Sequence, residues 1–77
     1  MKVWSDNLSY NLIWLRKHYG ISKRQMAYLL HISVGSINKI ERGELPPNLN
    51  VDFLFLILKY FHIRPNELLY RQIDGEP

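Results

Sequence analysis

Hydrophobic residues recur at helical spacing in segments that glycine and proline separate. The first segment runs from Ser5 or Asp6, either of which can cap a helix, to Gly20, which favours a helix end. Apolar residues three or four apart predict that one side of this helix faces a core. These residues are Leu8, Leu12, Leu15 and Tyr19.

Two short helices are predicted next. Ser22 is followed three residues later by Gln25, the pattern of a capping box, and the helix that it opens ends near Leu30. Ser33 is the cap candidate for a third helix, which Gly43 terminates. Met26, Ala27, Leu30, Ile32, Ile37 and Ile40 are expected to point into a common core. The small Ala27 permits a close, steep crossing of the two helices opposite Ile37.

Two further helices complete the pattern. Pro46 and Pro47 interrupt the chain, and Asn50 can then cap an apolar helix over residues 51–61. The aromatic and β-branched content of residues 51–63 leaves a strand open as the alternative. Pro65 suits the first turn of a fifth helix. For the fourth helix we expect Val51, Leu54, Phe55, Leu58 and Phe61 to face the core, and for the fifth Leu68 and Leu69.

Composition predicts a single domain, and the five predicted helices make it all-α. A chain of 77 residues with 47% hydrophobic side chains supports a single core, here a compact bundle of five helices over residues 6–71 with a polar tail at 72–77. The absence of cysteine fits a reducing compartment. Because no apolar run approaches the roughly 20 residues of a membrane span, we expect a soluble, cytoplasmic protein.

Positive charge is concentrated in the segment that holds the two short helices. Residues 16–43 contain six Lys and Arg against one Glu, a net charge of +5, whereas the rest of the chain carries −2. A basic segment in an otherwise slightly acidic chain indicates a surface that faces a polyanion.

These residues together resemble the Cro and phage-repressor-like (XRE-type) helix-turn-helix family. The likeness covers residues 12–69. The pieces that carry it are Leu15-Arg16, Gly20-Ile21-Ser22, Met26-Ala27, Ile32-Ser33, Ser36-Ile37, Ile40-Glu41-Arg42-Gly43 and Pro65-Asn66-Glu67-Leu68-Leu69. The resemblance implies a lambda-repressor-like bundle from a bacterium or phage, in which the second helix crosses the DNA backbone and the third, residues 34–42, enters the major groove.

The resemblance also implies roles for individual residues. Lys23 stands where the family often has a glutamine that touches a phosphate, and Arg16 and Glu41 match a pair that positions the third helix. The full set of predicted DNA-binding residues is Lys23, Arg24, Ser33, Val34, Gly35, Ser36, Asn38, Lys39 and Arg42. His31 replaces the usual turn glycine, and Val34 and Gly35 replace long polar side chains, which leaves little direct readout.

Other functions find little support in the sequence. His18, His31 and His62 stand singly, and no catalytic arrangement, metal site, cofactor-binding loop or small-molecule site is visible, so we do not expect an enzyme. The rival interpretation is a protein-interaction module that keeps the scaffold without recognising an operator.

A homodimer is a further expectation. Tyr10, Ile13 and Trp14 on the first helix, and Phe53, Leu56 and Tyr60 on the fourth, form two surplus apolar stripes that a second copy could cover. Folding of Val3 and Trp4, or of the segment around Tyr70, over these stripes is the alternative.

Overall fold

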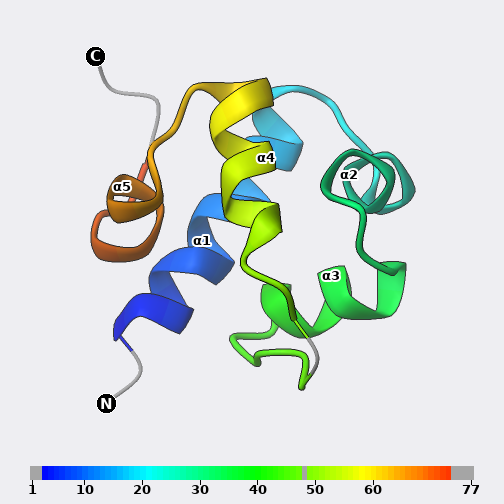
Figure 1. Ribbon diagram of the computed structural model, residues 1–77, viewed down its shortest axis with the longest axis horizontal. Helices are drawn as coiled ribbons and strands as arrows, with labels where there is room; N and C mark the ends of the chain where they lie inside the picture. The colour runs from blue at the N-terminus through cyan, green and yellow to red at the C-terminus, as the bar shows by residue number, and fades with distance from the viewer. Residues whose placement is uncertain (1–2, 48, 74–77) are drawn as a thin grey trace.

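The computed structural model describes residues 3–47 and 49–73, and this part of the chain forms five α-helices and no strand (Figure 1). The predicted all-α fold is therefore confirmed. Helix α5 lies on one side of α1 and α4, while α2 and α3 lie on the other (Figure 1). The helices are α1 (Val3–His18), α2 (Lys23–Leu30), α3 (Val34–Glu41), α4 (Asp52–Phe61) and α5 (Pro65–Tyr70).

Local capping sets most helix ends where the sequence predicts them. The Ser22 hydroxyl accepts a hydrogen bond from the Gln25 backbone N–H at 3.1 Å, and the Gln25 side chain accepts one from the Ser22 N–H at 2.8 Å. This is the predicted capping box of α2. His31 ends α2 in the left-handed conformation, with φ 57°, as its place in the turn implies.

Two helix starts differ from the expectation. Helix α1 already begins at Val3, so Ser5 and Asp6 lie inside its first turns rather than capping it. Helix α4 begins at Asp52 after Val51, which makes no side-chain cap bond. Asn50, the expected cap, lies one residue before the actual N-cap Val51. Its side chain still accepts a hydrogen bond from the Asp52 N–H at 2.9 Å.

One core collects apolar side chains from all five helices. Its fully or almost fully buried members are Leu8, Leu12, Leu15, Met26, Ala27, Leu30, Ile37, Ile40, Phe53, Ile57, Phe61 and Leu68. The predicted inward residues of α2 and α3 are thus correct, whereas Tyr19 of the first segment is 54% exposed.

The predicted orientation of α4 is wrong for three of its five residues, because only Phe61 and the partly buried Leu54 lie on the core side. Phe53, Ile57 and Phe61 form its buried face, while Val51 and Phe55 are 62% and 60% exposed and Leu58 also faces solvent. Because almost every residue of α4 is apolar, its pattern alone does not indicate which side meets the core. The packing of α4 against α2 and α5 determines its orientation.

Buried amides join α1 to the C-terminal helix. The Asn11 side chain has no solvent exposure, donates to the backbone oxygens of Leu68 and Arg71 at 2.6 and 2.7 Å, and accepts from the Ile73 N–H at 2.6 Å. Asn7 donates to the Leu69 oxygen at 2.9 Å. Ile73, the second residue of the predicted polar tail, is thus held against α1. Residues 74–77 and the side chains of Val3 and Trp4 lie outside the described part of the structure.

Candidate nucleic-acid interface

The first turn of α3 presents small side chains to solvent. The Ser33 hydroxyl accepts from the Ser36 N–H at 3.0 Å and caps the helix. Val34 is 37% exposed, and Gly35 is exposed beside it. A Cβ at Gly35 would meet only the Ser33 hydroxyl at 3.7 Å, an ordinary contact, so the fold itself has room for a side chain there.

The loop after α3 completes this surface. Pro46 and Pro47 line a shallow hollow of about 250 Å³ together with residues of α3. The α3 residues in it are Ser33, Gly35, Ser36 and Lys39. Sequence reasoning treated the two prolines only as helix breakers. Their place beside the α3 face depends on the path of the loop, which no local pattern indicates.

A hydrogen bond joins the two helices of the motif at the surface. The Lys23 ammonium group, at the start of α2, donates to the Asn38 side-chain oxygen in α3 at 2.8 Å. Sequence reasoning placed Lys23 on a phosphate and Asn38 among the DNA-binding residues, and it did not predict a contact between them. Their direct contact means that whatever holds one side chain also orients the other.

An ion pair fixes α3 against α1. The Arg16 guanidinium donates to both carboxylate oxygens of Glu41, through Nε at 2.8 Å and through an Nη at 3.2 Å, with both side chains largely buried. The pair that the resemblance implied is therefore present. The Ser9 hydroxyl adds a bond to the Glu41 backbone oxygen at 2.8 Å, a contact that sequence reasoning missed.

Ion pairs within the protein reduce the positive charge that this surface can present to a polyanion. Arg16 is neutralised by Glu41, and Arg42 lies 3.3 Å from the Glu44 carboxylate, just beyond the basic segment. Within residues 3–47 and 49–73, Lys17, Lys23, Arg24 and Lys39 form no ion pair. These four cations carry the positive field of the segment.

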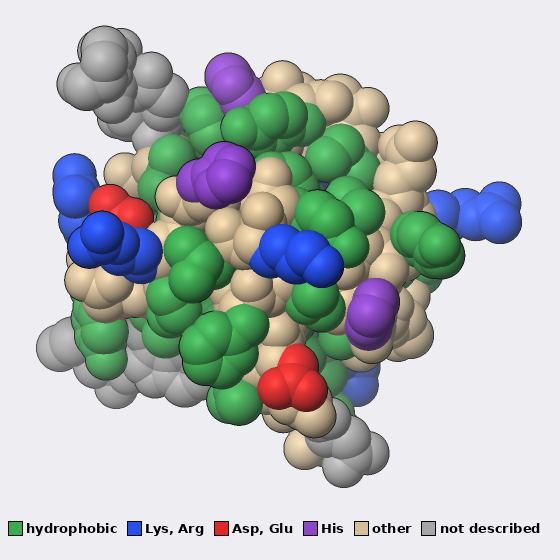
Figure 2. Space-filling model, turned by 45° about the horizontal axis from the view of Figure 1, so that its top comes forward, with side chains coloured by type: hydrophobic (Ala, Val, Ile, Leu, Met, Phe, Trp, Pro, Cys, Tyr) green, Lys and Arg blue, Asp and Glu red, His purple; other side chains and the backbone are tan. Residues whose placement is uncertain are grey.

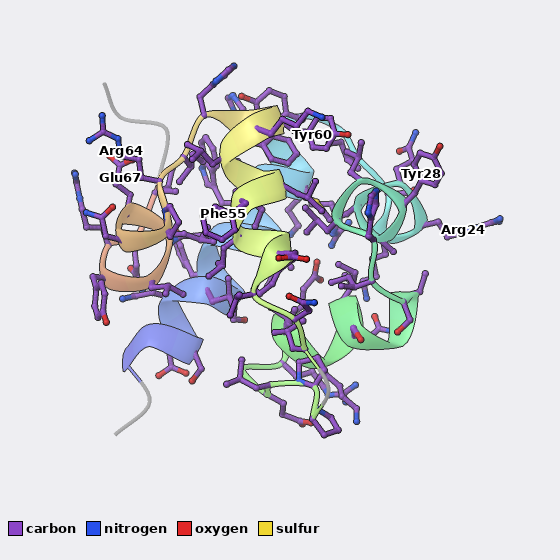
Figure 3. All side chains as sticks on the ribbon, viewed as in Figure 1. Arg24, Tyr28, Phe55, Tyr60, Arg64 and Glu67 are labelled. Atoms are coloured by element: carbon purple, nitrogen blue, oxygen red, sulfur yellow. The ribbon has the colours of Figure 1, made fainter. Side chains whose placement is uncertain are left out.

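The predicted DNA-binding residues belong to α2, α3 and the caps of α3. Lys23, Arg24 and Arg42 are exposed, while Asn38 and Lys39 are partly buried. Figure 3 shows Arg24 and Tyr28 pointing outward from α2, away from the rest of the molecule. Tyr28 is 81% exposed, so the outer side of α2 is open as well.

The predicted dimer stripes are only partly available. Tyr10 and Tyr60 are 40% and 42% exposed, Leu56 is partly buried, and Phe53 is a core residue and was wrongly placed at the surface. Tyr10, Ile13 and Trp14 line a groove of about 420 Å³ on α1, where Trp14 stacks on His18 with ring centres 4.4 Å apart.

The family model described as Helix-turn-helix matches residues 12–68, and the chain belongs to this XRE family of helix-turn-helix proteins. The family consists of regulators of transcription that bind double-stranded DNA and are generally not enzymes. No curated protein and no solved structure matches the chain significantly. Among the described residues, no helix is both long enough and apolar enough to cross a membrane.

Proposed function

We propose that this protein is a repressor-like regulator of transcription whose helix α3 enters the major groove of operator DNA. The observation that carries the proposal is the α3 face itself. Its first turn exposes Val34 and Gly35, next to Lys23 and Lys39, which form no ion pair with any residue that the structure describes. A helix whose first turn has only small side chains, with cations on either side, can approach closely into a groove between phosphates.

The proposed readout is semi-specific. The Val34 methyl groups can contact a thymine methyl, and Gly35 lets the backbone approach a base edge without adding a side-chain bond. Asn38 is the polar side chain on this face that can discriminate bases, and Lys39 and Ser33 are assigned to phosphates. Sequence-dependent DNA shape then contributes to any remaining preference.

Regulation follows from occupancy of the DNA. A bound domain that covers a promoter needs no activity besides DNA binding, which supports a repressor-like role. The proposal places the five helices in one domain that binds two half-sites as a homodimer. The absence of cysteine fits a reducing compartment, and the proposal places the protein in the cytoplasm, encoded by a bacterium or a phage.

Titration of random duplex DNA at two salt concentrations tests this function. Affinity is expected to fall steeply as salt rises, because bound cations release counterions from the phosphates. Lys23→Ala should reduce the slope of log affinity against log salt by about one unit, as for one lost phosphate contact. Arg71→Ala, which changes an exposed cation beyond α5, serves as the matched control and should leave the slope unchanged.

Absence of binding at low salt would refute the DNA-binding proposal for this chain. The scaffold would then be better explained as a protein-interaction module. Equal effects of Lys23→Ala and Arg71→Ala on the slope would show that the protein attracts DNA by net charge alone, without the proposed docking of α2 and α3.

A further inference from the structure

Helix α4 presents to solvent a face that combines large apolar side chains with two opposite charges. Successive residues turn by about 100° around a helix, so the positions opposite the buried Phe53, Ile57 and Phe61 share one side. We call this side the α4 outer face. It consists of Val51, Asp52, Phe55, Leu58 and Lys59, all of which are exposed.

The apolar side chains of this face are well exposed. Val51 and Phe55 keep more than half of their surface in contact with solvent, at 62% and 60%. Figure 2 shows hydrophobic side chains gathered over the side of the molecule to which α4 contributes. A groove of about 360 Å³ that includes Leu45, Val51 and Tyr70 extends this apolar surface toward α5. An exposed patch of this kind marks an interaction site.

The two charges indicate which partner fits. Asp52 and Lys59 are exposed and seven residues apart, or two helical turns, with Phe55 between them. Within the described residues neither forms an ion pair. The Lys59 ammonium group lies over the ring of its neighbour Tyr60, 5.5 Å from the ring centre. A partner surface therefore needs a cation opposite Asp52, an anion opposite Lys59 and an apolar centre.

The same face on a second copy of the chain has this arrangement. We propose that two copies associate through their α4 outer faces in antiparallel orientation, with the two-fold axis near Phe55. Asp52 then lies opposite the partner's Lys59 and Lys59 opposite the partner's Asp52, while the aromatic rings meet at the centre. A parallel arrangement would instead place like charges opposite one another, and this disfavours it.

The geometry predicts an association of modest strength. A stable interface buries about 800 Å² per partner, roughly a seventh of the 5199 Å² surface of this chain. A ten-residue helix is only about 15 Å long, so the flanking groove must contribute to reach that area. The dimer should therefore depend on concentration. This surface differs from the stripes expected from sequence, since it excludes Phe53 and Tyr10.

Sedimentation equilibrium of the free protein, without DNA, tests the proposal independently of the DNA-binding function. The wild type should show a monomer–dimer equilibrium, and Phe55→Glu should abolish the dimer. Tyr28→Glu is the matched control, since it places the same charge at an exposed aromatic residue on a different side of the molecule (Figure 3), and it should associate like the wild type. Unfolding temperatures measured in parallel show that each variant is folded.

Charge exchange tests the antiparallel orientation. Asp52→Lys and Lys59→Asp each convert two attractive pairs into two repulsive pairs, which should weaken self-association roughly tenfold. An equimolar mixture of the two variants regains both attractive pairs, so heterodimers should form with an affinity within about twofold of the wild type. This recovery cannot arise from a folding defect in either variant.

Three results would overturn the proposal. One is a wild type that stays monomeric at millimolar concentration, which would leave the face to a different protein. The second is a dimer that Phe55→Glu does not weaken, which would assign association to another surface such as the α1 groove. The third is a mixture of the charge variants that associates no better than either alone, which would exclude the antiparallel pairing.

Discussion

The bond between Lys23 and Asn38 predicts that contacts to phosphate and to base are energetically coupled. If each residue acted alone, the losses in binding free energy from Lys23→Ala and Asn38→Ala would add in the double variant. Because the ammonium group holds the Asn38 side-chain oxygen at 2.8 Å, removing either residue also releases the other. The double variant should therefore lose less affinity than the sum of the two single losses.

The expected coupling follows from the type of bond and its exposure. A hydrogen bond to a charged group contributes about 1.5–3 kcal/mol when it is shielded from water, and an exposed one contributes less. The bond is exposed in the free protein, and DNA would cover it in the complex. We expect a coupling of about 1 kcal/mol on the preferred duplex, a roughly fivefold departure from additivity.

A double-mutant cycle measured by fluorescence anisotropy on one duplex tests this coupling. The control cycle pairs Arg24→Ala with Asn38→Ala, because Arg24 points outward from α2 (Figure 3), and its losses should add to within about 0.5 kcal/mol. Additive losses for Lys23 and Asn38 as well would refute the coupling. The bond would then be a feature of the free surface that the complex does not use.

Three further predictions concern stability and the approach to DNA. Asn11→Ala removes three hydrogen bonds at a fully buried site and should lower the free energy of unfolding by about 3 kcal/mol in urea titrations. The exposed control Asn66→Ala should change it by less than about 0.5 kcal/mol. His31→Gly should raise the free energy of unfolding by about 0.5 kcal/mol, because glycine adopts φ 57° without side-chain strain. A lower free energy of unfolding would show that His31 is not strained in this conformation. Gly35→Ala should stabilise α3 by roughly 1 kcal/mol yet weaken DNA binding, and unchanged affinity would exclude close backbone approach at this position.

Local signals made most of the fold predictable. Several signals depend only on residues close together in the chain, so they can be recognised from the sequence alone. They are the capping residues Ser22 and Ser33, the left-handed His31 and the proline at the start of α5. The inward positions of α2 and α3 were also predictable, because both helices have a distinct apolar side.

The orientation of α4 and the role of Asn11 were not predictable in this way. An almost uniformly apolar helix has no polar side to indicate which residues face solvent, so only packing against other helices separates Phe53 from Phe55. Asn7 and Asn11 stand four residues apart beside the apolar positions of α1. That spacing is a signal that could have indicated inward-facing amides, but their backbone partners come from a segment about 60 residues away.

The candidate site also combines features that the sequence could predict with features that it could not. The resemblance identified the ion pair of Arg16 with Glu41, because it is carried by a family pattern of residues. It did not identify the bond between Lys23 and Asn38 or the placement of Pro46 and Pro47 beside α3. These depend on the crossing of two helices and on the path of a loop, which are properties of the three-dimensional arrangement.

The claim that α3 enters the DNA groove is tested most directly by one substitution at its tip. Val34→Glu adds a carboxylate to the first turn of α3, where the helix dipole tolerates it, so the protein should remain folded. The same carboxylate would face phosphates and base edges in the complex. Affinity for duplex DNA should therefore fall by at least about tenfold.

Tyr10→Glu places the same charge on a residue of α1 that is similarly exposed, at 40% against 37% for Val34. It should reduce affinity by no more than about twofold, because Tyr10 lines the groove on α1 and not the hollow beside the tip of α3, and salt screens the added charge. The measurement is the ratio of the dissociation constants of these two variants for one duplex at one salt concentration. A ratio of about five or more, with both variants folded, is the expected result. Equal dissociation constants would contradict it and place DNA contact on another surface.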